Sequence, residues 1–273
     1  MLIYGKEIKE NIKKELQQEA LSFKMALVIL QVGNDQSSAS YIKGILKFAE
    51  ESGIKAKVVN FPLDIAEDEL ITYISDLNND PEVTGIMIQT PLPAHLNNIR
   101  IINSIDYRKD VEGIHNYNLG KLLSREEGVK PATPKAVLRM LKEFDIPLEG
   151  KKVTVIGRSM VVGSPLAVML TSENATVTLC HSRTVNLIRE IQNADIIIAA
   201  LGRINFVTAE MVSNDAVIID VGTNFDKDGN MFGDVDQAAK TKARVASAVP
   251  GGVGVITVAE LFDNLRVLHK QNS

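Results

Sequence analysis

Lys152-Val-Thr-Val-Ile-Gly-Arg-Ser-Met-Val-Val-Gly-Ser-Pro165 is the stretch that decides how the second half of this chain folds. Its apolar beginning, residues 152–156, predicts a buried strand, and Gly157 at the end of that strand allows a tight turn. A helix is expected to begin at Ser164, and Gly163 lets the backbone approach a phosphate at the N-terminus of that helix, where free N–H groups attract anions. The spacing is not Gly-x-Gly-x-x-Gly, so this turn alone fits an ordinary strand–turn–helix equally well.

Further apolar runs follow this strand at helix-sized intervals. They predict strands over 175–180, 194–200 and 216–221, with helices between them. A closing helix is expected over 256–270. The β-α-β-α-β order is typical of a Rossmann-type nucleotide-binding domain.

The first half of the chain alternates in the same way. Strands are predicted over 26–32, 55–61 and 84–89, and helices over 38–52 and 67–77. Continuous apolar strands separated by helices favour a parallel sheet with helices on both faces. The predicted fold class is therefore α/β in both halves.

Residues 91–134 have a different composition. Prolines, glycines and charges are dense there, which predicts loops between two domains, where ligand sites often lie. A helix is expected from Pro134 to about Phe144, because proline is favoured in the first turn of a helix. A chain of 273 residues is long for one core and comfortable for two modest domains.

The composition indicates a soluble protein from a reducing compartment. The net charge of −4 argues against nucleic acid or an anionic membrane as the main partner. Cys180 is the one cysteine, so no disulfide can form within the chain and a cytoplasmic location is expected. The four histidines are scattered, so no metal site is expected. The charged N-terminus does not fit a signal peptide, and no apolar run is as long as a membrane span.

The end of the strand over 175–180 indicates which dinucleotide would bind. NAD-binding folds usually place an Asp or Glu there for the ribose 2′-hydroxyl. Here Ser182 and Arg183 follow the strand instead, and Arg158 lies in the first turn. Arginine and hydroxyl donors suit a 2′-phosphate, which favours NADP over NAD. A solvated Arg183 beside a helix cap is the alternative.

Seven short segments carry a resemblance that covers nearly the whole chain. They are Gln89-Thr-Pro-Leu-Pro93, Lys109-Asp-Val-Glu-Gly113, Pro131-Ala-Thr-Pro134, Gly157-Arg-Ser159 with Val162-Gly163, Cys180-His-Ser-Arg-Thr184, Gly233-Asp-Val-Asp236 and Val249-Pro-Gly-Gly-Val-Gly254. Each is weak by itself, but the ordered set is specific. Together they resemble the FolD family, the methylenetetrahydrofolate dehydrogenase/cyclohydrolases.

The resemblance implies an NADP-dependent oxidoreductase of one-carbon metabolism. Members of this family oxidise 5,10-methylenetetrahydrofolate to 5,10-methenyltetrahydrofolate, and most also hydrolyse that product to 10-formyltetrahydrofolate. They consist of two α/β domains flanking a cleft and usually form homodimers, so tetrahydrofolate derivatives and a second copy of the chain are the expected partners. The expected folate-binding catalytic domain is 1–133 with 256–273, and the expected NADP-binding Rossmann-type domain is 134–255.

The resemblance also implies site residues. Tyr41, Gln89 and Glu112 match the catalytic and folate-binding positions, with Glu112 in place of an aspartate that hydrogen-bonds the pterin ring. The other expected substrate-binding residues are Gly251, Gly252 and Thr257. The expected cofactor-binding residues are Gly157, Arg158, Ser159, Gly163, Ser182, Arg183 and Thr223.

Two of these positions also have a plainer structural interpretation. A tyrosine such as Tyr41 on an amphipathic helix is more often packing than catalysis. Residues 109–112 could form a solvated turn, or Asp110 could fix the loop and leave Glu112 as the ligand contact.

One position departs from the family in a way that bears on chemistry. The family's Tyr-x-x-x-Lys is here Tyr41-Ile-Lys-Gly-Ile45, so isoleucine stands where the lysine is expected. Lys43 and Lys47 lie two residues to either side, on the opposite face of the helix. Hydride transfer mainly needs positioning, whereas hydrolysis needs an acid–base group. We therefore expect dehydrogenase activity with weak or absent cyclohydrolase activity.

Three alternatives remain from the sequence. The first is a bifunctional dehydrogenase/cyclohydrolase in which another group replaces the lysine. The second is a different NADP enzyme on a similar plan, such as a shikimate-type dehydrogenase. The third is a non-catalytic folate or nucleotide sensor.

Overall fold

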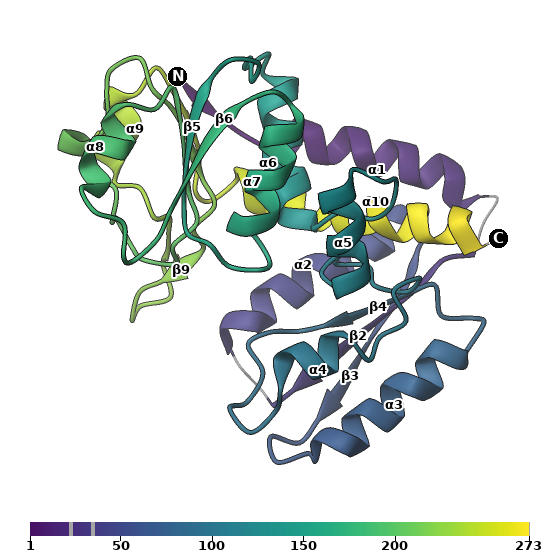
Figure 1. Cartoon of the computed structure of the whole chain (residues 1–273). Helices are drawn as coiled ribbons and strands as arrows, with labels where there is room; N and C mark the ends of the chain where they lie inside the picture. The colour runs from purple at the N-terminus through teal and green to yellow at the C-terminus, as the bar shows by residue number, and fades with distance from the viewer. Residues whose placement is uncertain (22–23, 34–35, 273) are drawn as a thin grey trace. The chain divides into compact units, whose positions relative to one another are not determined.

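The computed structural model describes residues 1–21, 24–33 and 36–272, which fall into two compact units. Unit 1 comprises Met1–Glu10 and Thr133–Thr257, and unit 2 comprises Asn11–Ala132 and Val258–Ser273. The chain passes between the units within helix α1 (Lys6–Ala20), at the first residue of helix α6 (Ala132–Glu143), and within helix α10 (Val253–Asn272); Figure 1 labels these three helices.

Unit 1 is built on a parallel sheet with the strand order β1-β11-β8-β7-β5-β6. Its strands are β1 (Leu2–Ile3), β5 (Lys152–Ile156), β6 (Thr176–Cys180), β7 (Ile196–Ala199), β8 (Val217–Asp220) and β11 (Val245–Ser247). Its other elements are α6, α7 (Gly163–Ser172), α8 (Leu187–Gln192), the 3-10 helix η1 (Ala209–Met211), α9 (Gln237–Lys242) and the hairpin β9 (Asn224–Phe225) with β10 (Met231–Phe232). β7 and β8 are buried along their whole length, as expected for central strands of a parallel sheet. The predicted α/β class and the predicted strands of this half are confirmed.

The strand order fixes where a ligand would lie in unit 1. From β5 the chain first moves outward to β6, and then returns to the other side of β5 to form β7. The loops after β5 and β7 therefore leave the sheet in opposite directions at neighbouring strands. Open parallel sheets bind ligands at the carboxyl end of such a switch point.

The amino-terminal residues belong to a different unit from the one predicted. Residues 1–10 were expected in the folate-binding domain, but β1 pairs in parallel with β11 and extends the sheet of unit 1. The amide of Ala246 donates to the carbonyl of Met1, and the amide of Ala248 donates to that of Ile3. A two-residue strand has no periodicity of its own, so only its partner reveals it. The structure places the other boundaries at Thr133 and Thr257, against the expected 134 and 255.

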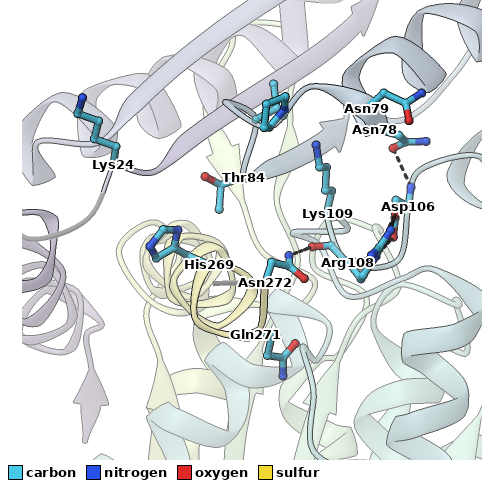
Figure 2. Close-up of a pocket in the computed structure, with 12 residues that line it drawn as sticks. Lys24, Asn78, Asn79, Thr84, Asp106, Arg108, Lys109, His269, Gln271 and Asn272 are labelled. Atoms are coloured by element: carbon cyan, nitrogen blue, oxygen red, sulfur yellow. Dashed lines mark hydrogen bonds and ion pairs between the residues drawn. The ribbon is translucent and has the colours of Figure 1, made fainter.

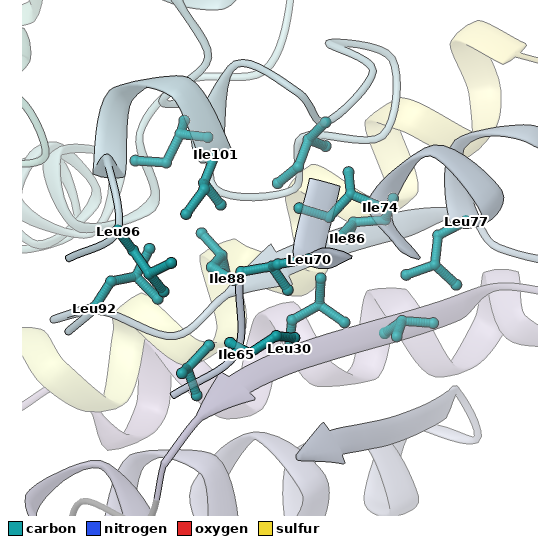
Figure 3. Close-up of a cluster of buried hydrophobic side chains, with 14 of the residues drawn as sticks. Leu30, Ile65, Leu70, Ile74, Leu77, Ile86, Ile88, Leu92, Leu96 and Ile101 are labelled. Carbon is teal, nitrogen blue, oxygen red and sulfur yellow. The ribbon is translucent and has the colours of Figure 1, made fainter. Parts of the chain in front are cut away.

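Unit 2 contains a smaller parallel sheet with the strand order β3-β2-β4. Its strands are β2 (Ala26–Val32), β3 (Lys55–Phe61) and β4 (Gly85–Ile88), and its helices include α2 (Gln36–Ser52) and α3 (Glu67–Asn79). Figure 3 shows Leu70, Ile74 and Leu77 of α3 in one buried cluster with Ile86 and Ile88 of β4. Their spacing of four and three residues puts them on one helix face, and burying each such side chain contributes about 1.5–3 kcal/mol.

The segment 91–134 is more ordered than its composition predicts. It contains helix α4 (Asn98–Ile102) and helix α5 (Asn116–Ser124), where only loops were expected. Both helices are short and start at a side-chain cap: Asn97 accepts from the amide of Arg100, and His115 accepts from the amide of Tyr117. Such brief helices carry too little apolar periodicity to be recognised from sequence.

Candidate active site

The carboxyl end of β4 carries the first predicted site residue. Gln89 follows this strand directly, and its amide donates to the carbonyl of Leu30 in β2 at 2.8 Å. Its side-chain amide donates to the carbonyl of Thr90 at 2.7 Å. The backbone of Gln89 is thus held by the sheet, at the edge where α/β sheets place ligand contacts.

The segment Lys109–Gly113 runs along the free edge of β4. The amide of Ile86 donates to the carbonyl of Lys109 at 2.7 Å, and Ile86 forms a parallel bridge with Asp110. Two residues further along, the backbone of Ile88 hydrogen-bonds the Glu112 carboxyl group. This register brings Glu112 to the end of β4, one residue before Gln89.

Asp110 fixes the loop that carries Glu112. Its carboxylate is 2% exposed and accepts from the amide of Gly113 at 3.0 Å, the amide of His115 at 2.8 Å and the side chain of Asn118 at 2.8 Å. Burial raises the pKa of Asp110, while these hydrogen bonds act in the opposite direction. The segment is therefore not a solvated turn, and the interpretation of Asp110 as the residue that fixes the loop is confirmed.

A second anchor holds the same loop from the C-terminal helix. The buried side chain of Asn264 in α10 donates to the carbonyls of Val111 at 2.9 Å and Lys130 at 2.8 Å. Lys109 points away from this point, and its ammonium group donates to the carbonyls of Leu77 at 2.9 Å and Asp80 at 2.6 Å. The ammonium group of Lys109 is thus bound at the C-terminal end of α3 and is not a site cation.

The charge of Glu112 acts on Tyr41. Burial and then the charge of Asp110 raise the pKa of Glu112 to about 8, against the hydrogen bond from Ile88. Burial and then the charge of Glu112 raise the pKa of Tyr41 above its ordinary value of 10.0. Tyr41 on α2 therefore faces the same charged group as the β4 edge, and Glu112 is the member of the pair that titrates near neutral pH.

Ile45 is fully buried one helical turn after Tyr41. Its side chain is 0% exposed, on the face of α2 that also buries Phe48, whose ring centroid lies 5.0 Å from that of Phe262. Lys43 and Lys47 are exposed, and Lys47 forms an ion pair with Glu51 at 3.8 Å. The predicted orientation of these two lysines is confirmed, so neither replaces the lysine expected at position 45.

In unit 1, the turn after β5 is so compact that neither Gly157 nor Gly163 could carry a side chain. Gly157 has φ +117°, and a Cβ there would collide with the carbonyl oxygen of Ala200. A Cβ on Gly163 would collide with the carbonyl oxygen of Gly157. The hydroxyl of Ser159 accepts from the amide of Val162 at 3.1 Å, and α7 begins directly afterwards without a side-chain cap. This compact turn fits a dinucleotide pyrophosphate at the start of α7.

Exposed arginines flank this turn on neighbouring strands. Ile156 and Cys180 pair across β5 and β6, so Arg158 and the turn containing Ser182 leave the sheet side by side. In that turn the amide of Arg183 donates to Nδ1 of His181 at 3.1 Å. Arg158, Ser182 and Arg183 are all exposed. Cationic and hydroxyl donors thus stand where a 2′-phosphate would be bound.

The remaining predicted residues are Gly251 and Gly252 in the loop after β11, Thr257 in α10 and Thr223 after β8. Gly251 has φ +97°, and its carbonyl accepts from the amide of Gly5 at 2.8 Å. A Cβ on Gly252 would collide with the carbonyl of Ala248, and Thr223 lies beside Gly254. Thr257 is 7% exposed, and its hydroxyl donates to the carbonyl of Val253 at 3.2 Å within α10. The folate-binding role of Thr257 stays a prediction, although its hydroxyl is already engaged.

A cavity of about 600 Å³ in unit 2 is lined by Lys109 but by none of the predicted site residues (Figure 2). It lies before the amino ends of β2 and β4, beside Lys24, Thr84 and Asn272. Among the described residues, no cluster of three or more His, Cys, Asp or Glu is arranged to hold a metal ion. Within the same residues, no helix is both long and apolar enough to span a membrane.

Both halves of the chain match one known protein family. Residues 3–112 match the catalytic domain of tetrahydrofolate dehydrogenase/cyclohydrolase, and residues 131–273 match its NAD(P)-binding domain. The chain belongs to this family. The shikimate-type alternative is therefore wrong, and the Rossmann-type unit of this FolD-family protein is a dinucleotide-binding domain.

Individual relatives match this chain over all or nearly all of their own lengths. The bifunctional protein FolD 2 of Syntrophomonas wolfei is 62% identical over 271 residues, covering 99% of this chain and 100% of the relative. The bifunctional FolD enzyme of Campylobacter jejuni has a TM-score of 0.95 at 38% identity, covering 100% of this chain and 99% of its own. The FolD enzyme of Trypanosoma brucei, solved with NADP cofactor and inhibitor, has a TM-score of 0.95 at 29% identity, covering 100% and 98%.

The two sets of predicted site residues fall within the two matched domains. Tyr41, Gln89 and Glu112 lie in unit 2, which contains most of the catalytic-domain match. The predicted dinucleotide contacts lie in unit 1, within the NAD(P)-binding match. The roles of the individual residues in this FolD-family protein stay predictions.

Proposed function

We propose that this FolD-family enzyme oxidises 5,10-methylenetetrahydrofolate with NADP⁺ and hydrolyses the resulting 5,10-methenyltetrahydrofolate to 10-formyltetrahydrofolate. The observation that carries the proposal is Glu112, a largely buried carboxyl group beside Tyr41 at the end of β4, whose pKa of about 8 suits proton transfer near neutral pH. The whole-length relative named as bifunctional supports it.

For the oxidation, the residues of this chain mainly bind and orient. The bound dinucleotide supplies the hydride acceptor. Gly157 and Gly163 allow the backbone to approach its pyrophosphate, and Arg158 with Arg183 would hold a 2′-phosphate, which favours NADP over NAD. Glu112 would hold the pterin ring. The nitrogen lone pairs of the substrate already favour loss of hydride, so alignment is the larger part of catalysis.

For the hydrolysis, the enzyme must move a proton while water attacks the methenyl carbon. Ile45 is buried and apolar, and Tyr41, whose pKa is raised, stays protonated. Glu112 is mostly protonated near neutral pH and can donate a proton, and its ionised form, which can accept one, grows as the pH approaches its pKa of about 8. The sequence predicts weak or absent cyclohydrolase activity because the lysine is missing. We propose instead that hydrolysis proceeds and that it depends on Glu112.

A paired assay tests both steps. Purified protein is given methylenetetrahydrofolate with NADP⁺ or NAD⁺ while reduced dinucleotide is followed, and methenyltetrahydrofolate alone while its absorbance decays. We expect reduction with preference for NADP⁺, and decay faster than in buffer. Absence of reduced dinucleotide with both cofactors would support the sensor alternative. Decay at the buffer rate would mean that Ile45 has removed the cyclohydrolase activity.

The homodimer and the cytoplasmic location stay predictions. Sedimentation equilibrium measures the mass of the assembly, and a value of one chain would contradict the dimer.

A further inference from the structure

Asp234 is a fully buried carboxylate that holds a tight loop by its backbone. It is 0% exposed and accepts from three consecutive amides, those of Leu201 at 2.5 Å, Gly202 at 3.0 Å and Arg203 at 2.7 Å. The side chain of Asn224 donates to it at 2.9 Å. All these donors are neutral, so the carboxylate is satisfied by oriented N–H groups, in the way that such groups bind anions elsewhere.

The loop that Asp234 holds lies at the switch point of the sheet. Leu201 to Arg203 follow β7, next to β5. The carbonyl of Ala200 faces Gly157 so closely that no side chain fits there. The loop and the glycine turn therefore line the same part of the carboxyl edge, where a dinucleotide binds.

The strand order also says which half of the dinucleotide meets this loop. Arg158, Ser182 and Arg183, which suit the 2′-phosphate of the adenosine ribose, lie after β5 and β6. β7 lies on the other side of β5. A dinucleotide whose pyrophosphate sits at the β5 turn must extend its nicotinamide half toward the loop after β7.

The hydrogen bonds to Asp234 fix the direction in which the carbonyl groups of the loop point. The two cis peptide bonds of the described chain lie elsewhere, at Pro91 and Pro250, so the loop peptides are trans. In a trans peptide the N–H and C=O groups point in opposite directions. Because the amides of Gly202 and Arg203 face Asp234, the carbonyls of Leu201 and Gly202 point away from it.

We propose that Asp234 is a positioning residue for the dinucleotide, turning the carbonyls of Leu201 and Gly202 outward to accept from the hydroxyls of the nicotinamide ribose. The inference rests on the dinucleotide binding proposed above. A carboxylate is required because its two oxygens accept four donors. Asparagine offers one acceptor oxygen and would direct its own N–H₂ group at amides.

A second buried carboxylate holds Asp234 itself in place. Asp220, at the end of β8, accepts from the amide of Asp234 at 2.9 Å and the amide of Val235 at 3.2 Å. The ammonium group of Lys240 lies 2.7 Å from the same carboxylate, and both side chains are buried. The amide of Asp220 donates to the hydroxyl of Ser247 at 2.8 Å. The loop is thus tied through Asp234 to the central strands of the sheet.

The test measures dinucleotide affinity separately from turnover. Asp234→Asn is compared with wild type by the fluorescence of bound NADPH. The matched control is Asp236→Asn, which removes the carboxylate that caps α9 through the amide of Ala239 but does not touch the loop. We expect Kd to rise roughly tenfold or more in Asp234→Asn, with little change in the control, in proportion to the lost hydrogen bonds. Equal Kd values for Asp234→Asn and wild type overturn the proposal.

A deoxy analogue distinguishes positioning from general stability. NADPH lacking a hydroxyl on the nicotinamide ribose should bind wild type more weakly, and this difference should shrink in Asp234→Asn. If Asp234→Asn does not fold, wild type alone decides, because equal affinity for both forms overturns the proposal. Wild type that binds neither form would instead refute the proposed function.

Discussion

Replacing Glu112 by glutamine should flatten the dependence of folding stability on pH. Burial and the charge of Asp110 raise the pKa of Glu112 from 4.5 to about 8 in the folded chain. Between these values the folded state keeps a proton that the unfolded state has lost. The stabilisation is therefore complete below the unfolded pKa and is lost as pH rises through the folded pKa.

The magnitude follows from the width of that interval. Each pH unit between the two pKa values lowers the free energy of unfolding by about 1.4 kcal/mol. From about pH 5 to about pH 7, the titration of Glu112 should therefore lower the free energy of unfolding of wild type by roughly 3 kcal/mol, and Glu112→Gln should show no such loss. The difference between the two proteins isolates Glu112, because Asp110 and the other carboxyl groups titrate in both.

Urea unfolding followed by circular dichroism at several pH values measures this difference. Glu82→Gln is the matched control, because Glu82 is an exposed glutamate in the same unit. The control should follow wild type at every pH, and Glu112→Gln should lose less stability than either as pH rises. Parallel curves for wild type and Glu112→Gln would refute the placement of Glu112 in a buried, charge-repelling site.

Three further predictions concern the site and its supports. Ile45→Lys should accelerate methenyltetrahydrofolate decay by about 10²-fold, the low end of what an acid–base group contributes. It should also lower the urea midpoint, because the substitution buries an ammonium group. An unchanged decay rate would mean that position 45 does not face the substrate. Lys240→Met should lower the free energy of unfolding by about 3–5 kcal/mol because it leaves Asp220 buried and unpaired, and adding Asp220→Asn should recover part of that loss. Arg183→Ala should raise the KM for NADP⁺ roughly tenfold with little change for NAD⁺, and an equal rise for both cofactors would contradict a 2′-phosphate contact.

Most strands were predictable because their signal is local. The apolar runs over 26–32, 55–61 and 152–156 coincide with β2, β3 and β5. Helix α1 was not predicted, although Ile8, Ile12 and Leu16 recur every four residues and are buried. That spacing was a usable signal, hidden among many charged residues. β1 and β11 were missed for a different reason, because strands of two or three residues acquire meaning only from their pairing.

Some residues of the candidate site were likewise predictable from local sequence, and others were not. Gly157 and Gly163 could be predicted because close approach to a carbonyl depends on the local turn, where any side chain collides. The absence of a lysine at position 45 was also legible from spacing alone. The role of Asp234 could not be predicted from the sequence, which showed it only as one residue of the segment Gly233–Asp236. Nothing near it in sequence indicates that it accepts from amides about thirty residues earlier.

The amino-acid sequence by itself determined the α/β class, the glycine turn after β5, the cations beside it and the isoleucine in place of a lysine at position 45, because each depends on a few neighbouring residues. Only the tertiary structure decided that Asp110 fixes a loop while Glu112 titrates near neutral pH, and that residues 1–10 join the sheet of unit 1. Burial, charge repulsion and strand pairing act between segments that the fold brings together, so their effects cannot be found in any single stretch of sequence.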